Sequence, residues 1–288
     1  MRIGVVFPQT ELGGDAGAVR AYGQRVEELG FTHILAYDHV VGADTNVHAG
    51  WAGPYDVHTT FHEPLVMFGY LAAITTTVEL VTGVIILPQL QTALVAKQAA
   101  EVDLLSGGRL RLGVGIGWNA VEYEALGEDF GNRGKRSEEQ ISLLRRLWTE
   151  PSVTFDGRYH RVTGAGLAPH PVQRPIPVWI GSASDVGYRR AGRLADGWFP
   201  MMAPGPKLDH ARAVLSEAAE EAGRDPSAIG MEGRTAWRGD DGAALHEIVA
   251  WAQAGASHLS INTMGAGLAT VDAHLDVLSR LSAALPAP

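Results

Sequence analysis

The amino-acid sequence predicts an α/β fold, a single (β/α)8 TIM barrel over residues 1–288 with insertions at the C-terminal face of the strands. Two observations predict it. The 288 residues fit the roughly 250 that such a barrel needs, with modest additions. Short β-branched runs alternate eight times with amphipathic helical segments, which implies parallel strands joined by right-handed crossovers.

A doubly wound open sheet is the alternative architecture, and the length alone would also allow two smaller domains. The open sheet usually has fewer strands and a glycine-rich loop after the first one. Here the first predicted strand ends in Phe7-Pro8-Gln9, without a GxGxxG motif. No internal repeat, low-complexity tract or domain linker stands out, so a single barrel domain is favoured.

The eight units follow in order from their residue patterns. In the first helix Val19, Tyr22 and Val26 recur at helical spacing, and Gly30 stands where the helix should end. The third strand is almost continuously apolar, as a strand buried on both faces should be. The predicted strands cover residues 3–7, 33–37, 78–87, 110–116, 177–180, 197–201, 229–237 and 258–261. The predicted helices cover residues 18–29, 64–75, 93–105, 121–126 with 137–148, 186–194, 208–222, 243–252 and 271–281.

Two insertions interrupt this alternation. Residues 39–62 are rich in Gly, Asp, His and Asn, and long loops in compact domains are usually functional, so this segment is the expected lid. The second insertion covers residues 150–175 and contains a hairpin signal, FDGRY, at residues 155–159.

Composition and charge exclude several classes of protein. The net charge of −9 argues against nucleic acid as a partner, since phosphate binding needs a basic surface. Arg189 and Arg190 are expected on a solvated helix face. The absence of cysteine excludes disulfides, thiolate nucleophiles and Cys-ligated zinc. The N-terminus has no signal-peptide pattern and no apolar stretch reaches about 18 residues, so a cytoplasmic protein without membrane contact is expected.

The candidate catalytic group lies at the end of the second predicted strand, because active groups of a barrel stand where its strands end. Asp38-His39 is the only adjacent titratable pair at such a position. A histidine exchanges a proton near neutral pH, and a neighbouring carboxylate orients its ring. The alternative is a helix-capping aspartate beside a surface histidine.

Two other strand ends carry patterns typical of ligand sites. Gly113, Gly115 and Gly117 alternate in the fourth strand, which indicates close approach of a ligand or a tightly packed barrel interior. Residues 181–185 (GSASD) join the fifth strand to its helix. The backbone amides there suit an anion such as phosphate, although an ordinary serine cap is the alternative.

The histidines of the first insertion do not predict a metal site. His39, His48, His58 and His62 are scattered over a polar segment. Metal-dependent barrel hydrolases place ligands on the first strand, and this first strand offers none. We therefore expect no metal, and histidines that are solvated or in contact with substrate.

Several segments, in order along the chain, resemble the luciferase-like monooxygenase superfamily. They are residues 37–39 (YDH), 82–88 (TGVIILP), 96–103 (AKQAAEVD), 106–110 (SGGRL), 112–118 (LGVGIGW), 177–181 (PVWIG) and 195–198 (ADGW). The segment SGGRLRLGVGIGWN followed by Glu122 is most similar to the branch that uses the deazaflavin coenzyme F420. The FMN-dependent branch shares most of these motifs.

This resemblance implies roles for individual residues. Asp38 would approach the cofactor ring, and His39 would donate or accept the proton near the carbon that carries the hydride. Gly83-Val84 matches a non-prolyl cis peptide behind the ring. The amides of Ala183 and Ser184 match positions that hold the cofactor phosphate. The implied cofactor-binding residues are Asp38, Gly83, Val84, Gly115, Gly117, Ala183 and Ser184.

Departures from the family pattern concern the substrate. Sugar-phosphate dehydrogenases of the F420 branch have a catalytic Glu where this chain has Trp118, a Trp near Ala43 and a Lys near Pro204, and this chain lacks all three. The expected substrate pocket is instead apolar or aromatic. Its residues are Trp51, Tyr55, Phe61, Trp118 and Met201. We therefore expect a largely apolar organic substrate with a polarised carbonyl or an activated double bond.

The sequence thus predicts an F420-dependent oxidoreductase that moves a hydride to or from such a substrate. The first alternative is an FMN-dependent monooxygenase that uses O2 and reduced flavin from a partner reductase. The second is a non-catalytic flavin- or ligand-binding barrel. Members of this family often form homodimers through early helices. Met67, Tyr70 and Leu71 would either serve such an interface or pack against the barrel.

Overall fold

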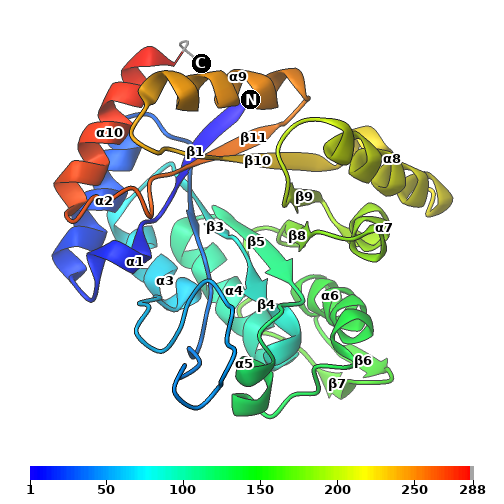
Figure 1. Ribbon diagram of the computed structural model, residues 1–288. Helices are drawn as coiled ribbons and strands as arrows, with labels where there is room; N and C mark the ends of the chain where they lie inside the picture. The colour runs from blue at the N-terminus through cyan, green and yellow to red at the C-terminus, as the bar shows by residue number, and fades with distance from the viewer. Residues whose placement is uncertain (286–288) are drawn as a thin grey trace.

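The computed structural model describes residues 1–285, a closed barrel of parallel strands surrounded by helices (Figure 1). The strands run around the barrel in the order β3-β2-β1-β11-β10-β9-β8-β5, and pairing of β3 with β5 closes it. The predicted (β/α)8 fold is confirmed, while residues 286–288 of the predicted domain lie outside the described part. The barrel strands are β1 Arg2–Val6, β2 His33–Ala36, β3 Glu79–Thr82, β4 Ile85–Ile86, β5 Leu110–Gly115, β8 Val178–Ser182, β9 Gly197–Pro200, β10 Gly230–Ala236 and β11 His258–Asn262.

The helices pack around the outside of the barrel (Figure 1). Most predicted boundaries lie within a few residues of the observed ones. Three one-turn helices were not predicted, because so few residues carry no periodic pattern. The long helices are α2 Ala16–Glu28, α3 Pro64–Ile74, α4 Thr92–Ser106, α6 Arg133–Thr149, α7 Asp185–Leu194, α8 Pro206–Glu221, α9 Asp241–Gln253 and α10 Val271–Ala284. The shorter ones are α1 Gln9–Leu12, α5 Ala120–Ala125, η1 Leu87–Gln89 and η2 Pro226–Ala228.

The helix ends follow from side chains that cap them. Asp15 begins α2 by accepting a hydrogen bond from the amide of Gly17 at 2.7 Å. Gly107 ends α4 in the left-handed region, with φ of 70°, which favours glycine. Local chemistry therefore sets the points at which the chain turns back toward the barrel.

The predicted third strand, residues 78–87, is wrong in one respect. It is divided into β3 and β4, and the peptide bond between Gly83 and Val84 is cis, at the place that the family resemblance implied. Both pieces pair with β5, so they occupy one position in the barrel. A Cβ atom on Gly83 would lie 2.3 Å from Leu35 Cδ2, so close packing against β2 requires glycine here.

Both predicted insertions are present. Residues 38–62 contain no helix or strand. In the second insertion, β6 Val153–Asp156 and β7 Arg161–Ala165 form an antiparallel hairpin. Glu139 of α6 accepts hydrogen bonds from the amides of Arg158 (2.7 Å) and Tyr159 (2.9 Å). The hairpin tip is therefore fixed beside α6. The prediction that this insertion lies at the C-terminal face is wrong, because it joins the end of α6 to the start of β8 and so leaves and re-enters the barrel where the strands begin.

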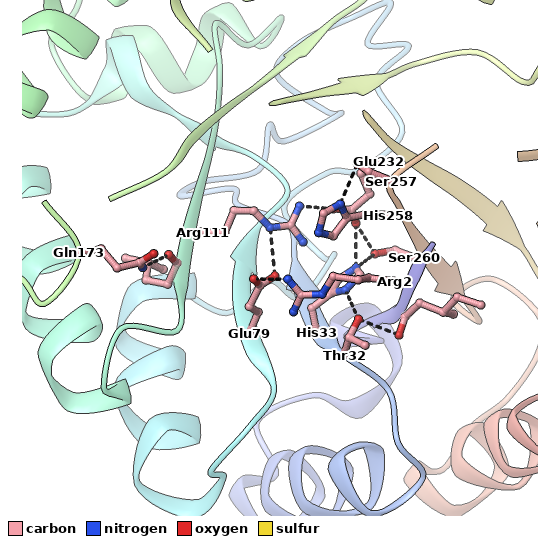
Figure 2. A network of polar contacts seen from close by, with 12 residues as sticks. Arg2, Thr32, His33, Glu79, Arg111, Gln173, Glu232, Ser257, His258 and Ser260 are labelled. Atoms are coloured by element: carbon pink, nitrogen blue, oxygen red, sulfur yellow. Dashed lines mark hydrogen bonds and ion pairs between the residues drawn. The ribbon is translucent and has the colours of Figure 1, made fainter. Parts of the chain in front are cut away.

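A network of buried charges fills the barrel interior and was not predicted (Figure 2). Arg111 of β5 donates to Glu232 of β10 at 2.5 Å and to Glu79 of β3 at 3.2 Å. The ring of His33 lies 3.1 Å from the Glu232 carboxylate and 3.0 Å from the hydroxyl of Ser260. Five strands of the barrel wall, β5, β10, β3, β2 and β11, are thereby connected by ion pairs and hydrogen bonds.

The helix residues considered for a dimer interface differ in exposure. Met67 and Leu71 are buried in the core of the chain itself, so they pack against the barrel. Tyr70 is partly exposed and accepts a hydrogen bond from Arg20 at 3.1 Å. Within residues 1–285, no helix combines the length and apolarity that crossing a membrane requires.

Candidate active site

A cavity of about 530 Å³ opens at the end of the barrel where the strands stop. All seven residues predicted to bind the cofactor line it: Asp38, Gly83, Val84, Gly115, Gly117, Ala183 and Ser184. His39, Trp118 and Met201 line it as well. The other predicted pocket residues, Trp51, Tyr55 and Phe61, are not part of this lining and stand behind it. The fold therefore brings strand-end residues far apart in sequence to a common wall.

Asp38 follows β2 and is only 5% exposed. Burial, together with the nearby carboxylates of Glu63 and Glu122, raises the pKa of Asp38 to about 7. A hydrogen bond from the amide of Ile86 at 3.3 Å acts in the opposite direction. Asp38 is thus a carboxyl group on the cavity wall that changes its protonation near neutral pH.

His39 stands beside Asp38 and is held by three side chains. Its Nδ1 lies 3.4 Å from Oε2 of Glu122. The ring of Tyr55 stacks on it with centroids 3.6 Å apart, and the ring of Phe61 is nearly perpendicular to it with centroids 4.7 Å apart. The predicted aromatic residues of the first insertion therefore orient His39, in addition to shaping the rim of the cavity.

Glu122 is a residue of the candidate site that sequence reasoning missed. It is 1% exposed and accepts hydrogen bonds from the amide of Val40 at 2.7 Å and the hydroxyl of Tyr55 at 3.1 Å. Burial alone would raise the pKa of Glu122, but His39 and these donors hold it below its usual range. An ionised Glu122 accepts from Nδ1–H of His39, which leaves Nε2 as the proton acceptor.

The sequence does hold a signal for Glu122. Asn119 caps α5 by accepting from the amides of Val121 (3.0 Å) and Glu122 (3.4 Å). A carboxylate three residues after the cap matches the capping-box pattern. That pattern predicts a helix start, whereas the contact with His39 joins residues 83 positions apart and depends on the fold.

The alternating glycines in and after β5 are explained by packing against the neighbouring chain from Thr82 to Ile86. A Cβ atom on Gly115 would lie 2.6 Å from Val84 Cγ2, and one on Gly117 would lie 2.6 Å from Ile86 Cγ2. Gly117 also has a φ of 64°, which disfavours other residues. The tightly packed interior is therefore observed, and the same glycines leave a smooth wall along the cavity.

The start of α7 forms the far end of the cavity. Ala183 and Ser184 are exposed there, and Ser184 caps the helix by accepting from the amide of Gly187 at 3.4 Å. The prediction that Arg190 is solvated is wrong, because Arg190 is 6% exposed, borders this end of the cavity and donates to Glu138 at 3.0 Å. Burial of Arg190 results from packing of α7 against α6, which the helix sequence alone does not reveal.

Aromatic side chains form one side of the cavity mouth. The indole of Trp118 is 46% exposed and lies 5.5 Å from the ring of Trp51 and 5.3 Å from that of Tyr55, centroid to centroid. Among the described residues, no three His, Asp or Glu side chains gather as a metal site would need. His62 instead contacts the carbonyl of Gly13 at 2.9 Å.

Comparisons with known proteins show to which family this chain is similar. The family of luciferase-like monooxygenases matches residues 1–281. A protein of unknown function from Mycobacterium tuberculosis is 38% identical over 164 residues, which is 57% of this chain and 56% of that protein. The match thus spans about half the length of such relatives.

An F420-dependent glucose-6-phosphate dehydrogenase from Intrasporangium calvum is 31% identical over 240 residues, 79% of this chain and 68% of that protein. Among solved structures, an F420-dependent secondary alcohol dehydrogenase in complex with an F420-acetone adduct superimposes with a TM-score of 0.80. That match covers 99% of both chains at 19% identity, so it supports the fold.

Proposed function

The chain belongs to the luciferase-like monooxygenase family, and we propose that within it the protein is an oxidoreductase that transfers a hydride between the deazaflavin F420 and a largely apolar organic substrate. The observation that carries this proposal is the arrangement of Asp38 and His39 on the cavity wall, with buried Glu122 behind the ring of His39. The relative named for F420 dependence, at 31% identity, supports the same cofactor.

The residues present fit a deazaflavin, which combines a flat ring with a phosphate-bearing tail. Glycines occupy positions in the cavity wall where even a Cβ atom would be too close to Val84 or Ile86, so the wall beside β5 is flat and unobstructed. The exposed N-terminus of α7 at the other end of the cavity suits a phosphate, since its amides and helix dipole favour an anion. Gly83, Val84, Gly115 and Gly117 would then border the ring.

When bound, the deazaflavin supplies the carbon that accepts or donates the hydride. Side chains of this protein accept or donate the proton that accompanies the hydride. Glu122 fixes Nδ1 of His39, so Nε2 is free to take a proton from a substrate hydroxyl or to return one to a substrate carbonyl. Asp38, with its pKa raised to about 7, would hold a proton beside the ring in part of the molecules at neutral pH.

The residues around the mouth support the substrate class. Trp118 and Met201 present apolar surface on the cavity wall, and the Tyr55-Phe61 pair packs behind it, which excludes water from the reacting atoms. The resemblance places the Glu of sugar-phosphate dehydrogenases at Trp118, and their Trp and Lys near Ala43 and Pro204, and this chain has none of the three. A sugar phosphate therefore fits this cavity poorly, whatever the relatives oxidise.

The test is a fluorescence titration of the purified protein with F420 and, in parallel, with FMN. We expect tight binding of F420 and weak binding of FMN. Steady-state assays of reduced F420 with enones, aldehydes and imines would then identify the hydride acceptor. A protein that ignores the whole panel would refute the proposed substrate class.

An FMN-dependent monooxygenase is the second candidate, favoured by the description of the family itself. It would require reduced flavin from a partner reductase and would consume O2. Preference for FMN in the titration, followed by oxygen uptake with reduced FMN, would support it. Binding of neither cofactor would instead favour a non-catalytic ligand-binding barrel.

A further inference from the structure

The cavity wall contains three charged side chains outside the Asp38-His39 pair. They are Arg190, Glu232 and Arg234. Glu232 pairs with Arg111, and Arg190 pairs with Glu138. Arg234 differs from both, because within residues 1–285 no carboxylate lies within ion-pair distance of its guanidinium. One positive charge on the wall is thus left without a counter-charge from the described part of the chain.

Neutral groups hold Arg234 in place. Its Nη1 donates to the hydroxyl of Tyr37 at 3.0 Å, and its Nη2 lies 3.5 Å from the sulfur of Met201. The guanidinium carbon also lies 5.5 Å from the ring centroid of Tyr37. These contacts orient the guanidinium without neutralising it. Arg234 borders a second cavity of about 400 Å³ as well, which His246 and Glu247 also line, although no carboxylate there is within ion-pair distance of Arg234 among the described residues.

The strand register explains why Arg234 faces the cavity. Arg234 stands two residues after Glu232 on β10, and side chains at this spacing share one face of a strand. Glu232 points into the barrel interior, where it meets Arg111. Arg234 therefore points inward one layer closer to the mouth, above the layer in which every charge is paired.

An apolar surface on another part of the cavity wall comes from Trp118, which follows β5. Its indole is 46% exposed on the cavity wall and is supported from behind by Trp51 and Tyr55. In the barrel order, β8 and β9 separate β5 from β10, so Trp118 and Arg234 stand on well-separated parts of the rim. The mouth thus offers one flat apolar surface and one unpaired cation.

We propose that the substrate is an organic acid, whose carboxylate pairs with Arg234 and whose apolar body lies against Trp118. A guanidinium binds a carboxylate through two parallel hydrogen bonds, and one cation matches a single negative charge. A phosphate monoester carries about −1.5 to −2 charges and would need more cations than this rim provides. The proposal rests on the proposed function in assuming that this cavity is the reaction site.

The experiment compares the binding of cinnamate with that of cinnamamide, which has the same apolar body and no charge. Calorimetric titrations at pH 7.5 use the wild type, Arg234→Gln, Trp118→Ala and, as a matched control, Arg238→Gln. Arg238 is an exposed arginine beyond the end of the same strand, and among the described residues its side chain donates hydrogen bonds only to the carbonyls of Trp237 and Met264.

We expect the wild type to bind cinnamate about tenfold or more tightly than cinnamamide, the usual scale for a charge-assisted hydrogen bond. Arg234→Gln should remove this preference and leave the affinity for cinnamamide unchanged. Trp118→Ala should weaken both ligands by a similar factor, and Arg238→Gln should weaken neither. This pattern of affinities would distinguish the contribution of the carboxylate to binding from that of the apolar body.

Equal affinity for the acid and the amide in the wild type, or no measurable binding of cinnamate, would overturn the proposal. So would a preference for the acid that survives in Arg234→Gln, because the anion would then bind elsewhere. The titrations are run on the F420-loaded protein and on the protein alone. Failure to bind F420 would count against the proposed function, while the comparison of acid and amide still tests the role of Arg234.

Discussion

Buried titratable groups in the barrel interior and at the ends of its strands behave in opposite ways. In the interior, burial alone would raise the pKa of Glu232, but Arg111 and His33 hold it far below its usual range (Figure 2). Where the strands end, burial does raise the pKa of Asp38, to about 7. The difference lies in the partners, since Glu232 is surrounded by cations and Asp38 has a backbone amide and two nearby carboxylates.

This contrast teaches that burial by itself does not identify a functional group. A buried charge whose partners come from neighbouring strands connects those strands and keeps one protonation state. A buried acid on a cavity wall without a cation changes its protonation in the working pH range. Four predictions would break or sharpen the distinction, and they follow in order of expected effect.

Arg111→Met would leave the buried carboxylate of Glu232 without its guanidinium partner, with only His33 and the hydroxyl of Ser260 beside it. Breaking such a pair costs about 3–5 kcal/mol, so the free energy of unfolding should fall by that amount in urea denaturation. Arg161→Met is the matched control, because its ion pair with Asp156 is exposed and is expected to contribute less than about 1 kcal/mol. Similar losses in both variants would contradict the structural role of the interior network.

Asp38→Asn should change how stability depends on pH. The pKa of this group rises from about 3.9 in an unfolded chain to about 7 in the fold. Between these two values the folded protein binds a proton that the unfolded chain lacks, and this proton stabilises the fold. The stabilisation is lost as the pH rises from about 4 to about 7. The loss amounts to at most about 4 kcal/mol.

The Asn variant cannot titrate and should not show this decline. We would measure the melting temperature of both proteins from pH 4 to pH 7. The difference between the two curves of melting temperature against pH gives the contribution of Asp38. Parallel curves would mean that Asp38 is ionised throughout, like the carboxylates of the interior.

His39→Ala should slow turnover roughly a hundredfold, the usual scale for a lost acid–base group. The affinity for F420 should change little, because the aromatic and glycine residues of the wall remain. Steady-state kinetics and the fluorescence titration measure the two effects separately. His58→Ala, an exposed histidine of the same loop, is the control and should keep full activity. Unchanged turnover in the His39 variant would remove this residue from the mechanism.

Glu122→Gln should have the smallest effect, roughly a tenfold loss of turnover, since His39 remains but is less well oriented. The ¹⁵N NMR signals of the His39 ring give an independent readout, assigned by comparison with His39→Ala. In the wild type the neutral ring should carry its proton on Nδ1, and the Gln variant should lose this preference. A ring with the proton on Nε2 in the wild type would contradict the assigned role of Glu122.

Much of the fold and part of the site could be predicted from residue patterns. The alternation of strands and helices, the two insertions and the strand-end position of Asp38-His39 depend on periodicity and on capping residues, which are local. The division of the third strand at Gly83-Val84 was implied by resemblance alone. Nothing in an apolar run reveals where a neighbouring strand such as β2 approaches too closely for a side chain.

By itself, the sequence determined the class of fold and which residues stand at the ends of the strands, because hydrophobic periodicity and turn residues act over a few positions. Tertiary structure alone decided the partners of those residues. It brought Glu122 to His39, buried Arg190 against Glu138, and left Arg234 facing the cavity without a carboxylate within the described residues. Such pairings depend on barrel closure, which sets distances between segments far apart along the chain, and these distances determine each group's charge and role.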